Sequence, residues 1–174
     1  MKDLLIPDIY AQSIYTIDYK KLKEKGIKCL LFDLDNTIAQ TYVKTPSKEI
    51  INKFEEIEEL GFKVIILSNA LKSRLKPFKE ILNVDTSALS CKPLSFKYKK
   101  IMMMYNYDEK DIAAIGDQLY TDIKGANKLN ITSILVNPLS KRESILTKYN
   151  RIKENKLFNK WEKQGIFERG VYYE

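Results

Sequence analysis

The sequence predicts an α/β fold: a doubly wound parallel sheet covered by helices on both faces, in three layers. Short apolar runs of strand length alternate along the chain with segments of helical periodicity of about 10–14 residues, which is the pattern of βαβ units. Polar residues, many of them acidic, directly follow these runs, as they do where parallel strands end at a ligand site. The length of 174 residues fits one domain, with no internal repeat or long linker.

The first half of the chain contains two expected buried strands. Residues 19–25 favour a short helix that stops at Gly26, and residues 27–32 then form an apolar run that leads into Asp33. Ser47 is the expected N-cap of a second helix, which Gly61 ends. The apolar side chains that recur at helical spacing in it are Ile50, Phe54, Ile57 and Leu60. Residues 62–67 form the next buried strand.

The second half continues the same alternation. Helical spacing resumes over residues 71–82, a weak strand follows at 86–89, and a helix opened by Pro93 covers 96–105. The remaining expected elements are a strand at 111–115, a helix at 119–129 and a strand at 131–136.

Composition excludes several classes of protein. The chain has no histidine, which removes Ser-His-Asp and Cys-His catalysis and all imidazole metal ligation. Cys29 falls on a buried strand and Cys91 at the start of a loop, which suits reduced thiols better than a disulfide or a zinc site. No apolar run approaches the roughly 20 residues of a membrane span, so we expect a cytoplasmic protein. The net charge of +7 favours anionic partners, and residues 139–174 contribute +4 of it.

Carboxylates follow the first buried strand in the run Asp33-Leu34-Asp35-Asn36-Thr37. Asp33 and Asp35 lie two positions apart, so their side chains point the same way and could share a cation. Asp33 then offers an oxygen nucleophile, and Asp35 a proton-transfer group. The alternative is a turn in which Asp and Asn make only local backbone hydrogen bonds.

Three later segments add to this pattern. Ser68 and Asn69 could hold a phosphate oxygen at the start of a helix, or Ser68 could simply be an N-cap. Lys92 could neutralise a phosphoryl group, although a lone lysine among 30 basic residues is usually a surface residue. Asp117 and Asp122 could complete an oxygen-ligand magnesium site; a capped helix with a solvated acid is the alternative.

The motifs DLDNT, SN, KP and GDQLYTD, each after a consecutive strand, resemble those of the haloacid-dehalogenase-like (HAD) superfamily of phosphohydrolases. The resemblance implies a Rossmann-like core in which Asp33 is the covalent nucleophile and Asp35 the general acid and base. It also implies Mg²⁺ held by the Asp33 carboxylate, the Asp35 backbone carbonyl and Asp117, with Asp122 helping through outer contacts or water.

The same resemblance assigns the phosphate-binding groups. Ser68, Asn69 and Lys92 would bind the transferring phosphoryl group. Thr37, which ends DLDNT and would support the site from outside the metal ligands, matches phosphatases better than dehalogenases. We therefore expect a single phosphatase domain over residues 1–174, made of an N-terminal segment (1–26), a catalytic core (27–138) and a basic, aromatic-rich C-terminal tail (139–174).

The spacing of the motifs leaves no room for the cap domain that many HAD members insert after the first motif or between the second and third. The closer resemblance is to the capless subclass IIIA phosphatases of the phosphatidylglycerophosphatase type, also called the YqeG family. It is carried by the Pro7-Asp8 and Ser13-Ile14 segments, by the GDQ start of the last motif and by the stretch Lys148-Tyr149-Asn150-Arg151. A second basic residue beside Lys92 is missing, and the Lys- and Tyr-rich tail also departs from the pattern.

The resemblance implies phosphatidylglycerophosphate as substrate, an anionic phospholipid reached from the inner face of a membrane. The basic, aromatic tail could lie at the bilayer interface or could pack on the domain. Two other functions stay open. One is a phosphatase of soluble nucleotides, sugar phosphates or nucleic-acid ends. The other is a non-catalytic basic protein that binds RNA or a ribosomal particle.

Overall fold

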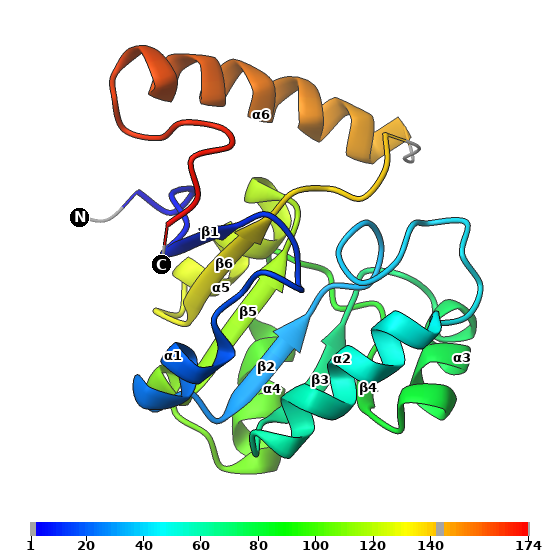
Figure 1. Cartoon of the computed structure of the whole chain (residues 1–174). Helices are drawn as coiled ribbons and strands as arrows, with labels where there is room; N and C mark the ends of the chain where they lie inside the picture. Colours follow the sequence, from blue (N-terminus) through cyan, green and yellow to red (C-terminus); the bar gives the residue numbers. More distant parts are fainter. Residues whose placement is uncertain (1–2, 142–144, 174) are drawn as a thin grey trace.

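A computed structural model describes residues 3–141 and 145–173, and it has the predicted α/β architecture (Figure 1). Six parallel strands form one sheet in the order β1-β6-β5-β2-β3-β4. The strands are β1 (Ile9–Ala11), β2 (Cys29–Phe32), β3 (Lys63–Leu67), β4 (Asp85–Ser87), β5 (Ile112–Gly116) and β6 (Thr132–Val136). Because β2 lies between β5 and β3, the chain turns in opposite directions on either side of it, which is the arrangement of a doubly wound sheet.

The helices are α1 (Tyr19–Glu24), α2 (Lys48–Glu59), α3 (Lys72–Leu82), α4 (Phe96–Tyr105), α5 (Lys124–Asn127) and α6 (Ile145–Lys163). A 3₁₀ turn, η1 (Glu109–Asp111), precedes β5, and a π turn, η2 (Leu119–Ile123), leads into α5. The predicted N-cap of helix α2 and the predicted glycine at its end are both confirmed. Ser47 Oγ accepts the backbone N–H of Ile50, and Gly61 has a φ of 84° just after α2.

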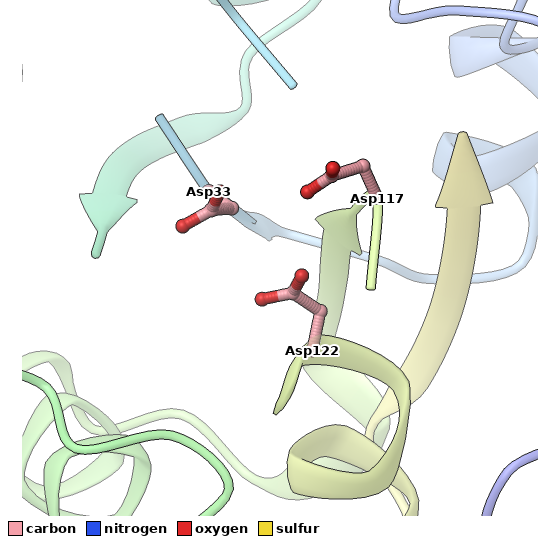
Figure 2. A group of neighbouring side chains, drawn as sticks. All are labelled: Asp33, Asp117 and Asp122. Carbon is pink, nitrogen blue, oxygen red and sulfur yellow. The ribbon is translucent and has the colours of Figure 1, made fainter. Parts of the chain in front are cut away.

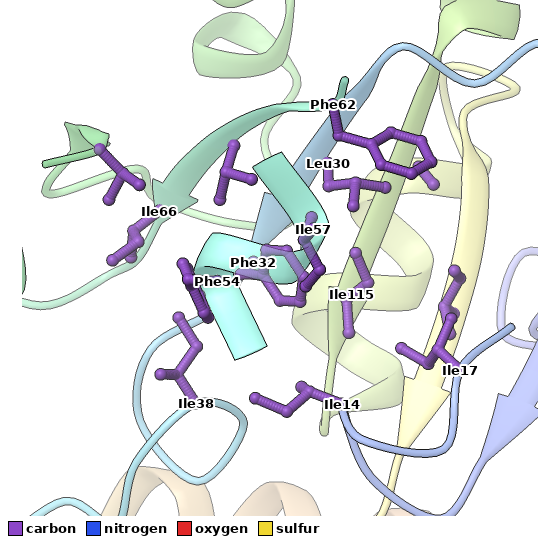
Figure 3. Packing of buried hydrophobic residues seen from close by; sticks show 14 of the residues in the cluster. Ile14, Ile17, Leu30, Phe32, Ile38, Phe54, Ile57, Phe62, Ile66 and Ile115 are labelled. Carbon is purple, nitrogen blue, oxygen red and sulfur yellow. The ribbon is translucent and has the colours of Figure 1, made fainter. Parts of the chain in front are cut away.

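Alternate residues of each strand pack on opposite faces of the sheet, and each face has its own core. Leu30 and Phe32 of β2 pack against helices α1, α2 and α3, as in the cluster of Figure 3. Cys29 and Leu31 face the other way, against Tyr98 and neighbouring residues of α4 and α5. Strands buried on both faces explain the uninterrupted apolar runs in the sequence.

The weak strand expected at 86–89 is β4 at Asp85–Ser87, and two other elements differ more from the sequence prediction. The N-terminal segment contributes β1, an edge strand of three residues that pairs with β6. The helix expected at 119–129 is divided into η2 and the short α5. Here the backbone N–H groups of Gln118 and Leu119 bond to the carboxylates of Asp122 and Glu154, so side-chain contacts shape the start of this segment.

The C-terminal tail packs on the domain. In Figure 1, α6 crosses above the β1, β6 and β5 side of the sheet, and the chain then returns to β1. Trp161 and Phe167 are buried against Tyr10, Leu119 and Leu135. Backbone hydrogen bonds of 2.8 and 2.9 Å join Tyr10 to Tyr173. Of the expected tail, residues 142–144 and 174 lie outside the described part of the chain. Among the described helices, none is both long and apolar enough to cross a bilayer.

Candidate active site

Three carboxylates converge beyond the carboxyl ends of the central strands (Figure 2). Asp33 directly follows β2, Asp117 follows the adjacent strand β5, and Asp122 lies on η2. All three side chains are buried, and each offers an oxygen within 4.8 Å of the others. Clustered carboxylate oxygens are the ligand set that a hard divalent cation prefers, so these three residues could hold a metal ion.

Lys92 supplies the positive charge in this cluster. Its Nζ lies 2.6 Å from Oδ1 of Asp33 and 2.6 Å from Oδ1 of Asp122, and its side chain is buried. Burial alone would lower the pKa of Lys92, but the carboxylates of Asp122 and Asp33 outweigh that effect and raise it. Lys92 is therefore a permanent cation next to the proposed nucleophile, whereas an ordinary surface lysine would be exposed and free to move.

Asn69 holds the loop that presents Lys92. Its Oδ1 accepts the Lys92 backbone N–H and the Ser90 hydroxyl at 2.8 Å each, and its Nδ2 donates to the Lys92 carbonyl at 3.3 Å. The carboxamide that we expected near the phosphate thus contacts protein backbone. Ser68 is buried at the end of β3, and its Oγ accepts the Ala70 N–H at 3.2 Å. It caps this local turn, since α3 itself starts later, at Lys72.

Burial and mutual repulsion raise the pKa values of carboxylates in this cluster. Burial raises the pKa of Asp33 to about 7, Lys92 opposes the shift and Asp122 adds to it. Burial also raises the pKa of Asp117 well above its usual range, against the effect of Arg151. Three buried acids facing two cations leave surplus negative charge. A bound divalent cation would relieve this surplus, and the donor set therefore fits a metal.

Asp117 is fixed from the C-terminal helix. Arg151 of α6 donates from Nη2 to the Asp117 carboxylate and from Nη1 to its carbonyl oxygen at 2.6 Å. Nη1 also bonds Glu154 at 2.9 Å, and Glu154 accepts the Leu119 N–H at 2.7 Å. The hydroxyl of Thr37 donates to Asp117 Oδ1 at 3.3 Å. The C-terminal tail therefore contacts one of the three clustered acids directly.

Gly116 makes room for Asp122. A Cβ at this position would overlap the carboxyl group of Asp122, so the residue before Asp117 must lack a side chain. The Asp122 carboxylate is then held over the strand end by the Gln118 N–H at 3.1 Å. Asp122, expected to act from outside the metal ligands, therefore belongs to the same cluster, with a carboxylate oxygen within 4.8 Å of those of Asp33 and Asp117.

The side chain of Asp35 is not part of the cluster of three acids. Its Oδ1 accepts bonds from Arg74 of α3, at 3.0 Å from Nε and 2.9 Å from Nη2. Arg74 also donates to the carbonyls of Val43 at 2.6 Å and Gln40 at 3.3 Å, so it ties α3 to the loop after β2. Sequence reasoning gave no role to Arg74, Arg151 or Glu154. Arg151 entered only as part of the Lys148–Arg151 stretch.

The described chain has no cap domain over the carboxyl ends of the strands. No secondary-structure element of a cap lies between β2 and α2 or between β3 and α3 in the described chain. Over β5 and β6 the strand ends are instead covered by α6, through the contacts of Arg151 and Glu154 (Figure 1).

The family model described as mitochondrial PGP phosphatase matches residues 1–139. The chain belongs to the PGP phosphatase family. A relative, the probable phosphatase YqeG of Bacillus subtilis (strain 168), is 32% identical over 165 residues, which cover 95% of this chain and 96% of the relative. The phosphatidylglycerophosphate phosphatase 1, chloroplastic/mitochondrial, of Arabidopsis thaliana is 22% identical over 95% of this chain, which spans only 50% of that protein.

Solved structures agree on the fold. A putative 3-deoxy-D-manno-octulosonate 8-phosphate phosphatase from Vibrio cholerae has a TM-score of 0.56 at 15% identity, covering 74% of this chain and 78% of that one. An uncharacterized protein from Listeria monocytogenes serotype 4b has a TM-score of 0.53 at 18% identity, covering 68% and 85%. The chain is thus a phosphatase of the PGP phosphatase family, and the predicted family, fold and enzyme class are confirmed.

Proposed function

We propose that the chain is a magnesium-dependent phosphomonoesterase that acts through an aspartyl-phosphate on Asp33 and that its substrate is phosphatidylglycerophosphate. The observation that carries the mechanism is the convergence of Lys92 with the carboxylates of Asp33, Asp117 and Asp122 at the carboxyl end of β2 and β5. Membership of the PGP phosphatase family supports the substrate.

Asp33 is suited to be the nucleophile. In the first step its carboxylate oxygen forms a bond to phosphorus while the bond from phosphorus to the leaving alkoxide breaks. Lys92 reduces the repulsion between this carboxylate and the phosphate dianion, because its Nζ already contacts Asp33 in a buried setting. Bound Mg²⁺, held by Asp33, Asp117 and the Asp35 carbonyl with help from Asp122, would add further neutralisation of the phosphoryl oxygens.

Asp35 is suited to move the proton. It donates a proton to the leaving alkoxide in the first step. In the second step its carboxylate takes a proton from water, which attacks phosphorus and releases inorganic phosphate from Asp33. Arg74 keeps the Asp35 side chain apart from the metal-binding group, which leaves it available for proton transfer.

The lack of a cap element between β2 and α2 and between β3 and α3 in the described chain favours a bulky substrate. A phosphomonoester that protrudes from a lipid surface could reach Asp33 without a cap, and the net charge of +7 favours an anionic surface. We therefore place the enzyme at the inner face of a membrane as a peripheral protein.

Phosphate release from phosphatidylglycerophosphate in mixed micelles tests this proposal, in Mg²⁺ or in EDTA, with wild type and Asp33→Asn. Asp18→Asn serves as the control, because Asp18 is the N-cap of α1 and asparagine also caps helices well. We expect release only with Mg²⁺, loss in Asp33→Asn and near-normal rates in Asp18→Asn.

Two other results would redirect the assignment. If an aryl phosphate is cleaved in an Asp33-dependent way but the lipid is inert, the mechanism holds and the substrate is a soluble phosphate. If neither is cleaved, the mechanism is wrong and salt-sensitive RNA binding becomes the function to test.

A further inference from the structure

Four exposed apolar side chains lie on segments that also carry residues of the site, and we name them the apolar rim. They lie on the loop after β3, on the segment that joins β4 to α4 and at the first residue of α4: Leu71, Leu89, Leu94 and Phe96, with exposed fractions of 62%, 49%, 55% and 49%. A soluble monomer can expose single apolar residues anywhere, but several on adjoining loops mark an interaction site.

Hydrogen bonds hold the two loops of the rim together. The Leu89 N–H donates to the Ala70 carbonyl at 3.0 Å, and the Ser90 N–H donates to the Ser68 carbonyl at 3.0 Å. The same loops carry Ser68 and Lys92, so the rim lies on the segments that supply two of the proposed phosphate-binding residues. Leu89 also has a φ of 48°, a conformation that a bulky residue rarely adopts. The structure thus holds a large apolar side chain in solvent at a cost in backbone energy.

Basic residues are concentrated in the segment that carries the rim. Apart from Lys92 and Arg74, which bond to acids of the site, residues 68–105 contain six lysines and only two acidic residues, Glu80 and Asp85. Those two acids already pair with Lys76 and Lys63. A groove of about 300 Å³ along β4 is lined by Lys72, Lys97 and Lys100, and it shares Lys72 with a neighbouring hollow of about 460 Å³ lined by Lys76 and Lys79.

We propose that the apolar rim and these lysines dock the enzyme on an anionic phospholipid bilayer, with the active site facing the lipid. Leucine and phenylalanine side chains can enter the region below the headgroups, while the lysines lie among the lipid phosphates. Charge complementarity selects this partner over a neutral surface. This inference rests on the proposed function, because it places the lipid phosphomonoester next to Asp33.

The fold also argues against a membrane-binding surface in the C-terminal tail, which is the alternative location. The aromatic residues of the tail that would anchor it most strongly, Trp161 and Phe167, are buried against the sheet. The tail contacts the end of β5 through Arg151 and Glu154, whereas the apolar rim lies at the β3 and β4 side of the sheet.

Vesicle co-sedimentation tests the proposal without turnover. The vesicles contain phosphatidylcholine alone or with phosphatidylglycerol, which has no phosphomonoester. We expect wild type to bind the anionic vesicles, less so in high salt. The double variant Leu89→Asn, Phe96→Ser should lose at least about fivefold in binding while cleaving a soluble aryl phosphate at the normal rate. Asparagine suits the left-handed backbone at position 89.

Two matched controls decide the location. The variant Ile81→Asn, Met103→Ser removes side chains that are 46% and 84% exposed near the other ends of α3 and α4, and it should bind normally. Lys72→Gln, Lys76→Gln should weaken binding, whereas Lys20→Gln, Lys25→Gln at the two ends of α1 should not. Equal loss in rim and control variants, or wild-type binding by the rim variant, overturns the proposal.

The outcomes separate this proposal from the proposed function. Asp33-dependent hydrolysis in micelles together with vesicle binding that ignores the rim would refute the docking surface alone. Rim-dependent vesicle binding without hydrolysis of the lipid would refute the substrate while leaving the docking surface in place. Binding of RNA but not of anionic vesicles would refute both the docking surface and its lipid partner.

Discussion

Arg74 controls the position of Asp35. A guanidinium is a rigid fork, and this one bonds the Asp35 carboxylate twice while it also bonds the Val43 carbonyl. Asp35 is less buried than the clustered acids, so without this contact its side chain could turn into solvent. The proton-transfer step that we assign to Asp35 therefore depends on a residue of α3 that need not touch the substrate.

Arg74→Gln should lower kcat for an aryl phosphate by about 10- to 100-fold and change KM much less, because a misplaced catalytic group costs roughly that much. Arg74→Lys, which cannot form both bonds to the carboxylate, should recover only part of the rate. Steady-state kinetics on folded, thermally matched samples measure both effects.

The exposed Lys76 on the same helix provides the comparison, since Lys76→Gln removes a positive charge without touching Asp35. A normal kcat in Arg74→Gln would show that Asp35 needs no positioning. A rise confined to KM would instead make Arg74 a substrate-binding group.

Residues of the site differed in how well the sequence predicted them. Asp33, Lys92 and Asp117 belong to short motifs beside strand ends, so the predicted strands were enough to bring them together. Arg74 and Arg151 reach the site from helices with long side chains. Nothing local distinguishes them among 30 Lys and Arg residues, because their partners lie 39 and 34 positions away in the chain.

At the scale of elements, long periodic segments were predicted well and short contact-dependent ones were not. The helix expected at 96–105 is α4, with the same bounds. Strand β1 has three residues and follows Pro7, and it exists because it pairs with β6, whose residues lie about 125 positions later. Such a pairing leaves no periodic signal in the N-terminal sequence.

The C-terminal tail is an element whose packing can be tested directly. Trp161 is buried between α6 and the sheet, whereas Tyr149 on the same helix is 55% exposed. Trp161→Ala should therefore lower the free energy of unfolding by about 3–5 kcal/mol. Tyr149→Ala should change it by less than about 0.5 kcal/mol. Urea denaturation gives both values; a small loss in Trp161→Ala would mean that the tail does not pack on the domain in solution.

For the whole molecule, the charge is distributed unevenly between surface and interior. The chain carries +7 overall, yet its active site buries three carboxylates against Lys92 and Arg151. Burying like charges opposes folding unless a cation is bound. We therefore expect the metal-free protein to be less stable than the protein with a metal ion bound in the active site.

Asp33→Asn should stabilise the protein in EDTA at pH 8, by on the order of 1 kcal/mol or a Tm rise of about 2–4 °C. The folded pKa of Asp33 is raised to about 7, so the stability it contributes is complete below its unfolded pKa of about 4 and is lost as the pH rises through 7. The advantage of the variant should grow between pH 5 and pH 8. Added Mg²⁺ should reverse it, because the ion stabilises wild type by mass action. Thermal melts across this pH range measure the difference in Tm between the two proteins. If Asp33→Asn melts at a lower temperature than wild type in EDTA at pH 8, Lys92 fully compensates the buried carboxylates without a metal.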